Sequence, residues 1–82
     1  MAKKPKTGDR VVVTWLDIQA DPIGEVEDAD VWCAETEGRF VCWKKGKYGK
    51  VLVLSDTRGR DDKEFYGTTA FPAGAVVKVE TI

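Results

Sequence analysis

The chain has 82 residues and a formal net charge of −1; 43% of its residues are hydrophobic and 33% are charged. This length fits one domain with a thin core, and this composition excludes an intrinsically disordered chain. No apolar run approaches the roughly 18 residues of a membrane helix, and the N-terminus lacks the apolar segment of a secretory signal. We therefore expect a cytoplasmic protein that does not enter a membrane.

The charged residues are sorted along the chain. Residues 1–10 carry four Lys or Arg against one acid, residues 11–38 carry eight acids and no base, and residues 39–50 carry five bases and no acid. Such blocks can form separate patches, or they can neutralise one another when the strands come together. Mixed surfaces are the ordinary condition of soluble domains, so we expect neutralisation.

The first strand is predicted over residues 10–16, a β-branched and aromatic run that follows a turn signal at residues 7–9. Alternation places Val11, Val13 and Trp15 on the face that better suits a core. Residues 1–9 are expected to be a flexible basic tail, and residues 10–82 a single domain.

An acidic loop is predicted next, over residues 17–30, because a proline and a glycine interrupt it and its apolar residues lack helical periodicity. We expect Ile18, Ile23 and Val26 to pin this loop to the body, since long connections without anchors are unusual. A helical turn within residues 25–30 is the alternative. The acids of the loop up to the next strand are Asp17, Asp21, Glu25, Glu27, Asp28 and Asp30.

Residues 31–35 and 39–44 are predicted to form a hairpin around Glu37 and Gly38. With a two-residue loop, Cys33 would face Cys42 and Trp32 would face Trp43 across the ribbon, which favours this register. A three-residue loop with a bulge at the glycine would instead pair Cys33 with Val41. Two cysteines are too few for a disulfide scaffold or a four-ligand zinc site, and whether they are bridged stays open.

A second turn is predicted at residues 45–49, followed by a strand over 50–55 with apolar residues on both faces and a polar loop over 56–63. Apolar residues on both faces indicate a strand in the interior of the sheet.

The C-terminal part reads as two strands, residues 65–71 and 75–81, joined by a tight turn at residues 72–74. Proline cannot donate to a ladder and glycine can turn freely, so this turn redirects the chain. Val77 and Val79 are expected to face inward.

These short strands and turns, without a convincing helix, predict an all-β fold. The order of elements favours a small antiparallel five- to six-stranded barrel of the SH3-like or Sm-like type, with a long acidic loop after the first strand. Closure would remove the exposed edges of a small sheet.

Four segments carry a family resemblance: residues 13–17, Cys33 to the Gly38–Val41 run, residues 51–55, and residues 67–79. In them the chain resembles a group of small, largely uncharacterised bacteriophage and prophage proteins of similar length. It departs from that group in lacking an aromatic residue in the acidic loop and in a longer spacing from cysteine to glycine. The resemblance implies a phage-encoded accessory protein that acts in the host cytoplasm, and it implies no particular activity.

The first functional hypothesis is a non-enzymatic module that binds another protein, for example a host protein, through the acidic loop. Acids concentrated on one loop can steer encounter with a basic partner or mimic a nucleic-acid backbone. The alternative is that the loop is only a solvated, solubilising segment.

The second hypothesis is nucleic-acid binding through the lysine-rich turn and the N-terminal lysines. Lysines around two glycines could contact phosphates, and a tyrosine could stack on a base. The net charge and the acids between the two basic segments argue against it. The residues of the turn are Lys44, Lys45, Lys47, Tyr48 and Lys50.

Catalysis is the least expected class, and no cofactor or metal is expected. The chain has no histidine, which removes the commonest general base, and Asp61 and Asp62 are adjacent and better explained as solvated loop residues. Outward-facing apolar residues such as Val12, Val76 and Ile82 could support a small homo-oligomer through an edge strand, and a monomer is the alternative.

Overall fold

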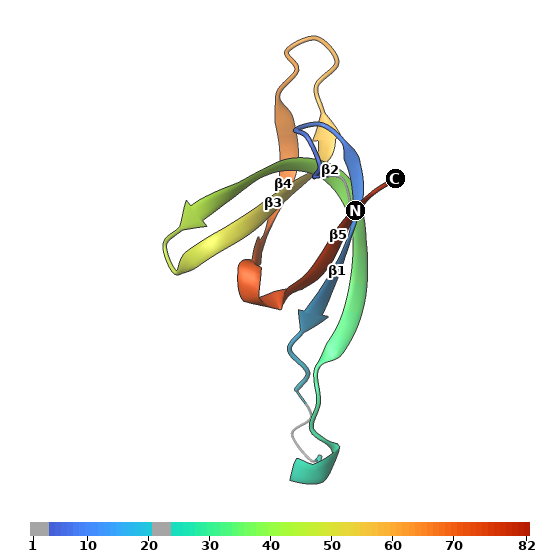
Figure 1. The fold of residues 1–82 in the computed structure, drawn as a ribbon, viewed down its shortest axis with the longest axis vertical. Helices are drawn as coiled ribbons and strands as arrows, with labels where there is room; N and C mark the ends of the chain where they lie inside the picture. Colours follow the sequence, from blue (N-terminus) through green and yellow to red (C-terminus); the bar gives the residue numbers. More distant parts are fainter. Residues whose placement is uncertain (1–3, 21–23) are drawn as a thin grey trace.

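The computed structural model describes residues 4–20 and 24–82. One antiparallel sheet contains five strands in the order β4-β3-β2-β1-β5 (Figure 1). The strands are β1 (Arg10–Asp17), β2 (Trp32–Gly46), β3 (Gly49–Arg58), β4 (Phe65–Pro72) and β5 (Val76–Thr81), with two 3-10 helices, η1 (Val26–Asp28) and η2 (Ala73–Ala75). The predicted all-β antiparallel fold is confirmed.

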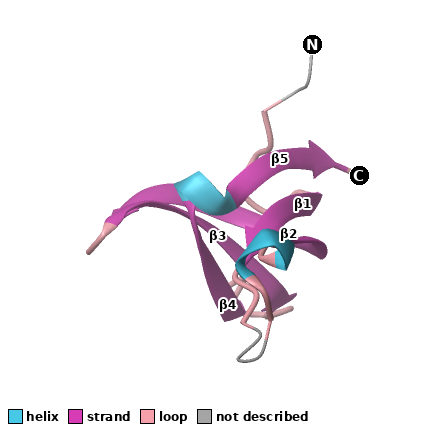
Figure 2. Ribbon diagram, turned by 90° about the horizontal axis from the view of Figure 1, so that it is seen from below, coloured by secondary structure: helices cyan, strands magenta, loops and turns pink. Residues whose placement is uncertain are grey.

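The sheet is strongly curved but not closed (Figure 2). The edge strands β4 and β5 are joined through η2, at the position predicted for the C-terminal turn, and no ladder pairs them within the described residues. None of the helices in the described ranges is long and apolar enough to cross a membrane.

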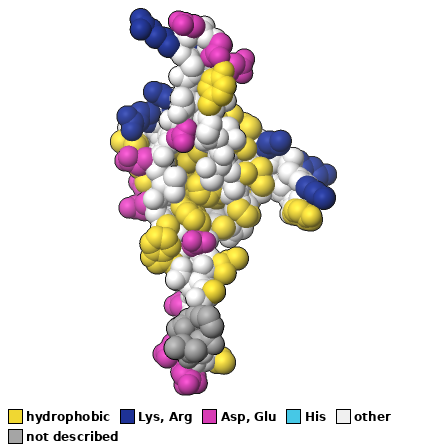
Figure 3. Space-filling view, turned by 180° about the vertical axis from the view of Figure 1, so that it is seen from behind, with side chains coloured by type: hydrophobic (Ala, Val, Ile, Leu, Met, Phe, Trp, Pro, Cys, Tyr) yellow, Lys and Arg dark blue, Asp and Glu magenta, His cyan; other side chains and the backbone are white. Residues whose placement is uncertain are grey.

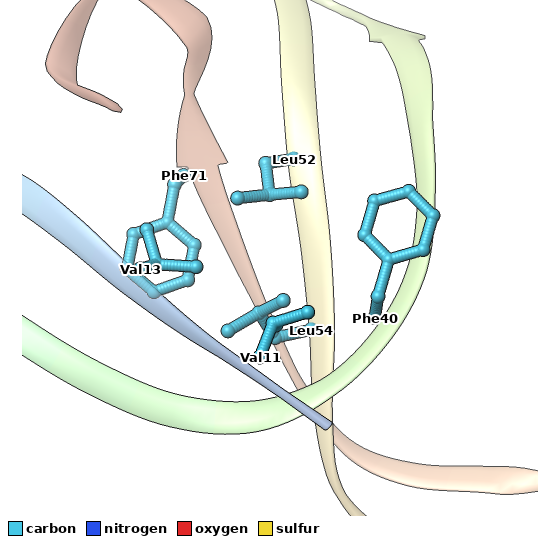
Figure 4. Packing of buried hydrophobic residues seen from close by; sticks show 6 residues of the cluster. All are labelled: Val11, Val13, Phe40, Leu52, Leu54 and Phe71. Carbon is cyan, nitrogen blue, oxygen red and sulfur yellow. The ribbon is translucent and has the colours of Figure 1, made fainter. Parts of the chain in front are cut away.

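The core lies on the concave face of the sheet and draws on four strands (Figure 4). Trp15, Val76 and Val79 are partly buried and pack against it. The predicted inward face of β1 is therefore confirmed, as is the interior position of β3. The six buried residues of the cluster are Val11, Val13, Phe40, Leu52, Leu54 and Phe71.

The predicted hairpin at Gly38 is wrong, because β2 is one strand of 15 residues that passes straight through this position. Its first half pairs with β1 and its second half with β3. An added Cβ on Gly38 would lie 3.1 Å from the carbonyl oxygen of Ser55, so the glycine permits a close backbone approach inside the sheet.

The residue pairs expected from that hairpin are wrong as well. Cys33 lies opposite Leu16 and Trp32 lies opposite Asp17, while Cys42 and Trp43 pair with β3. Both cysteines are free thiols.

Two irregularities in register decide which side chains face the core. Phe40 pairs with Leu54 and Cys42 with Val53, so the intervening Val41 is an extra residue on β2. On β5 the extra residue is Val77, which is 56% exposed. The expectation that Val77 faces inward is therefore wrong, whereas that for Val79 is confirmed.

The acidic loop is not pinned to the body in the predicted way. Ile18 is 85% exposed and Val26 is 88% exposed, and Ile23 lies outside the described residues. The loop projects away from the sheet (Figure 1) and contains η1, as the helical alternative anticipated.

Thr14 carries a buried hydroxyl whose Oγ1 has no hydrogen-bond partner among the described residues. Replacing Thr14 by valine keeps the shape and removes the uncompensated polar atom, so we expect the free energy of unfolding to rise by about 1 kcal/mol. Urea unfolding measured by tryptophan fluorescence tests this. Thr68→Val, at an exposed position of β4, is the control and should change little. A less stable Thr14→Val variant would contradict the prediction.

Candidate functional site

The charged blocks of the sequence remain apart in the fold. Among the described residues the single ion pair joins Lys78 Nζ and Glu80 Oε1, 3.2 Å apart and both well exposed. Within the described residues, no ion pair joins the acidic segment 11–38 to the basic segment 39–50, so direct ion pairs do not provide the expected neutralisation. Acids lie at the end of the projecting loop, and lysines gather on a hairpin that points in a different direction (Figure 3).

We call the described residues 17–20 and 24–31 the acidic arm. It holds five of the six predicted acids (Asp17, Glu25, Glu27, Asp28 and Asp30), and the sixth, Asp21, lies outside the described residues. The side chains of Asp17 and Asp30 accept hydrogen bonds from the amides of Ile18 and Val31, both at 2.8 Å. These two contacts shape the backbone where the arm leaves β1 and where it approaches β2.

Large apolar side chains are exposed on the same arm, a feature that the charge pattern had obscured. Besides Ile18 and Val26, Val31 is 53% exposed, and Trp32, the first residue of β2, is 55% exposed. A hollow of about 550 Å³ lies within the arm, with Val26, Val31 and Trp32 in its lining. A loop that served only solubility would not require these side chains.

An apolar groove of about 450 Å³ lies at the base of the arm, between the end of β1 and the β4–η2 junction. Its lining includes Trp15, Leu16, Ile18, Phe71 and Pro72. The ring of Trp15 packs edge-on against Phe71 with centroids 5.4 Å apart, and its indole N–H donates to Thr36 Oγ1 at 2.9 Å. These two contacts hold one wall of the groove in place. Asp17 also lines the groove, which links it to the acidic arm.

We call residues 43–50 the lysine hairpin. Gly46 pairs with Gly49, so Lys47 and Tyr48 form its two-residue turn. All the predicted nucleic-acid-binding residues (Lys44, Lys45, Lys47, Tyr48 and Lys50) are brought together here and are exposed, Tyr48 to 92%.

Sequence reasoning missed Trp43 as a member of this surface. Lys50 Nζ lies 5.0 Å from the centre of the Trp43 ring, and Lys47 Nζ lies 5.4 Å from that of Tyr48. Alternation from Phe40 would have placed Trp43 on the opposite face of β2, and only the extra residue Val41 brings it to this one.

The N-terminal segment is attached at the base of the lysine hairpin. Thr7 Oγ1 donates to the carbonyl oxygen of Val41 at 2.9 Å, and the Gly8 amide donates to that of Phe40 at 2.7 Å. Lys4 and Lys6 are exposed on the same segment, and Lys3 lies outside the described residues.

Asp62, in the β3–β4 loop, is engaged in local structure. It accepts hydrogen bonds from the Tyr66 hydroxyl and from the Glu64 amide, which lower the pKa of Asp62, while the same contact raises the pKa of Tyr66. The Asp62 contribution to stability is therefore present above its unfolded-state pKa and lost as pH falls through the folded pKa. The Tyr66 contribution is present below its unfolded-state pKa and lost as pH rises through the folded pKa.

Within residues 4–20 and 24–82, no group of three or more His, Cys, Asp or Glu side chains could hold a metal ion. Comparison of the chain with protein-family models, with curated proteins and with solved structures found no match.

Proposed function

We propose that this protein is a non-enzymatic protein-interaction module whose acidic arm and adjoining apolar groove bind a cationic segment of another protein. The observation that carries the proposal is the exposure of Ile18, Val26, Val31 and Trp32 on one projecting element, among acids that form no ion pair within the described part of the chain. Exposed apolar side chains within a polar rim are typical of protein-binding surfaces.

The chemistry of the surface defines the partner. Apolar anchors of the partner would fill the groove beside Trp15 and Phe71, whose mutual contact keeps that wall formed before binding. Lysine or arginine side chains next to those anchors would lie against the carboxylates of the arm, which have no cation of their own among the described residues. The charges would steer the encounter and the apolar contacts would supply most of the affinity.

The fold that we propose is the SH3-like small barrel. The strand order, with β1 paired to both β2 and β5, and the single 3-10 turn between β4 and β5 support this type. The resemblance to phage proteins supports an accessory role in the host cytoplasm, and the absence of histidine from the chain supports a role without catalysis.

The test is comparative capture of proteins from a bacterial lysate. The wild-type protein and an Ile18→Ser, Val26→Ser variant are immobilised, and retained proteins are quantified at about 0.1 M and about 0.5 M salt, where exposed charges are increasingly screened. We expect a specific protein to be retained by the wild type at both concentrations and to be lost from the variant, because apolar contacts resist screening.

Val77→Ser, Ile82→Ser is the matched control, since both residues are exposed apolar side chains outside the arm and the groove. It should retain the same protein as the wild type. The proposal would be overturned if the arm variant retained this protein, or if the control lost it as the arm variant does. It would also be overturned if the wild type retained no specific protein.

A further inference from the structure

The lysine hairpin places two of its lysines and the ring of Trp43 on one face. Lys45 lies directly opposite Lys50. Trp43 lies opposite Leu52, and each of these residues is two positions from the lysine on its own strand. Directly opposed residues and those two positions apart share a face of an antiparallel ribbon, so Trp43, Lys45 and Lys50 lie together. Leu52 belongs to the core, so this face continues the concave side of the sheet beyond the core.

This arrangement works against the stability of the hairpin by itself. Like charges directly opposite each other on neighbouring strands are destabilising. No carboxylate within the described residues forms an ion pair with Lys44, Lys45, Lys47 or Lys50. The contacts of Lys50 with Trp43 and of Lys47 with Tyr48 offset part of this cost, and a local cost of this kind is typical of a functional surface.

The fold also removes the main objection to a polyanionic ligand. The acids between the two basic segments of the sequence lie largely on the arm and on the β1-paired half of β2, away from the hairpin tip (Figure 1). The N-terminal segment, with Lys4 and Lys6, is fastened at Val41, at the base of the hairpin.

We propose that the lysine hairpin binds single-stranded nucleic acid, with lysines on the phosphates and with Tyr48 and Trp43 available to stack on bases. The strand must be single because a ring as exposed as that of Tyr48 can only stack on a base that is not enclosed in a duplex. Lysine contacts to phosphates supply attraction without sequence preference, and base stacking is similarly tolerant of sequence. This surface is distinct from the arm and the groove.

The experiment measures fluorescence anisotropy of a labelled oligothymidylate of ~20 nucleotides, long enough to span the tip, from about 50 to about 300 mM NaCl. If all four hairpin lysines contact phosphates, log K should fall against log salt with a slope of roughly −3, at about −0.7 per contact. Lys45→Gln, Lys50→Gln should reduce the size of this slope by about 1.4. Tyr48→Ser should weaken binding about tenfold and leave the slope unchanged.

Lys63→Gln, Lys78→Gln is the matched control, because it removes the same charge from exposed positions outside the hairpin. It should keep the wild-type slope, as should the arm variant Ile18→Ser, Val26→Ser. If the control reduced the slope as much as Lys45→Gln, Lys50→Gln does, net charge alone would explain the binding and the proposal would be overturned. Three further results would also overturn it: wild-type affinity in Tyr48→Ser, equal affinity for a double-stranded oligonucleotide of the same length, and competition by polyglutamate as effective as that by the unlabelled oligonucleotide. The absence of any binding at the lowest salt concentration would overturn it too.

Discussion

Replacing Leu52 by alanine is expected to lower the free energy of unfolding by about 2–5 kcal/mol. Leu52 is fully buried and lies opposite Phe71 on β4 and Trp43 on β2, so its side chain links three strands. Among the described residues the buried cluster contains six apolar side chains, so few neighbours can move into the cavity. Urea unfolding, followed by tryptophan fluorescence and circular dichroism, measures the loss.

The control for this loss is Val77→Ala, which also truncates an aliphatic side chain within a strand but at a position that is 56% exposed. It should change the free energy of unfolding by less than about 1 kcal/mol. Leu52→Met, which nearly conserves volume, should cost less than about 1.5 kcal/mol and shows whether the effect comes from the cavity. Equal losses in Leu52→Ala and Val77→Ala would mean that Leu52 is not at the centre of the core.

Local patterns predicted the strands whose side chains alternate without interruption. Val11, Val13 and Trp15 were assigned to the core face of β1 by period two alone, and β3 was recognised as interior by its apolar residues on both faces. In these segments the burial of alternate side chains and the strand propensity of the residues favour the same structure. The C-terminal 3-10 turn was predictable for a related reason, since Pro72 and Gly74 restrict the chain locally.

The course of β2 could not be predicted because Gly38 serves a contact that is distant in sequence. A glycine between two β-prone runs favours a hairpin on local grounds. Here its missing side chain lets the backbone of Ser55 approach, and that contact depends on β3, which follows later in the chain. The same residue therefore fits two structures, and only the packing of the sheet selects between them.

Register irregularities limited the prediction of the candidate surfaces. One extra residue reverses the faces of everything that follows it, so Val41 brings Trp43 to the lysine face and Val77 turns outward on β5. The lysines and Tyr48 were predictable because they are adjacent in sequence. The apolar groove was not, because β1 and the β4–η2 junction supply its walls from opposite ends of the chain.

The separation of charge follows from the same long β2 strand. The acidic block leads into the half of β2 that pairs with β1, and the basic block ends the half that pairs with β3. A hairpin at Gly38 would have laid these halves side by side and neutralised them. One continuous strand holds them apart, which is why the arm and the lysine hairpin can offer two surfaces of opposite sign.

Ser55 lies where the β3–β4 ladder is interrupted. Ser55 pairs with Thr68 and Thr57 with Tyr66, but the intervening Asp56 and Gly67 do not pair, and Gly67 has a φ of 62°. Ser55 is 1% exposed, and its hydroxyl lies within hydrogen-bond distance of the carbonyl oxygens of Thr57 and Tyr66. It also accepts a hydrogen bond from the Thr57 amide at 3.2 Å. The Ser55 side chain thus contacts backbone groups of Thr57 and Tyr66 at the point where the ladder is interrupted.

Replacing Ser55 by alanine is therefore expected to lower the free energy of unfolding by about 1 kcal/mol, because the buried hydroxyl that contacts the backbone groups of Thr57 and Tyr66 is lost. Urea unfolding measures the loss, and amide hydrogen exchange should show faster exchange at Thr57. Thr68→Ala is the matched control, since Thr68 lies directly across the ladder from Ser55 but is exposed, and it should change stability by no more than about 0.5 kcal/mol. If the two variants were equally stable and Thr57 exchanged as in the wild type, the hydroxyl would not hold the two strands together where their ladder is broken.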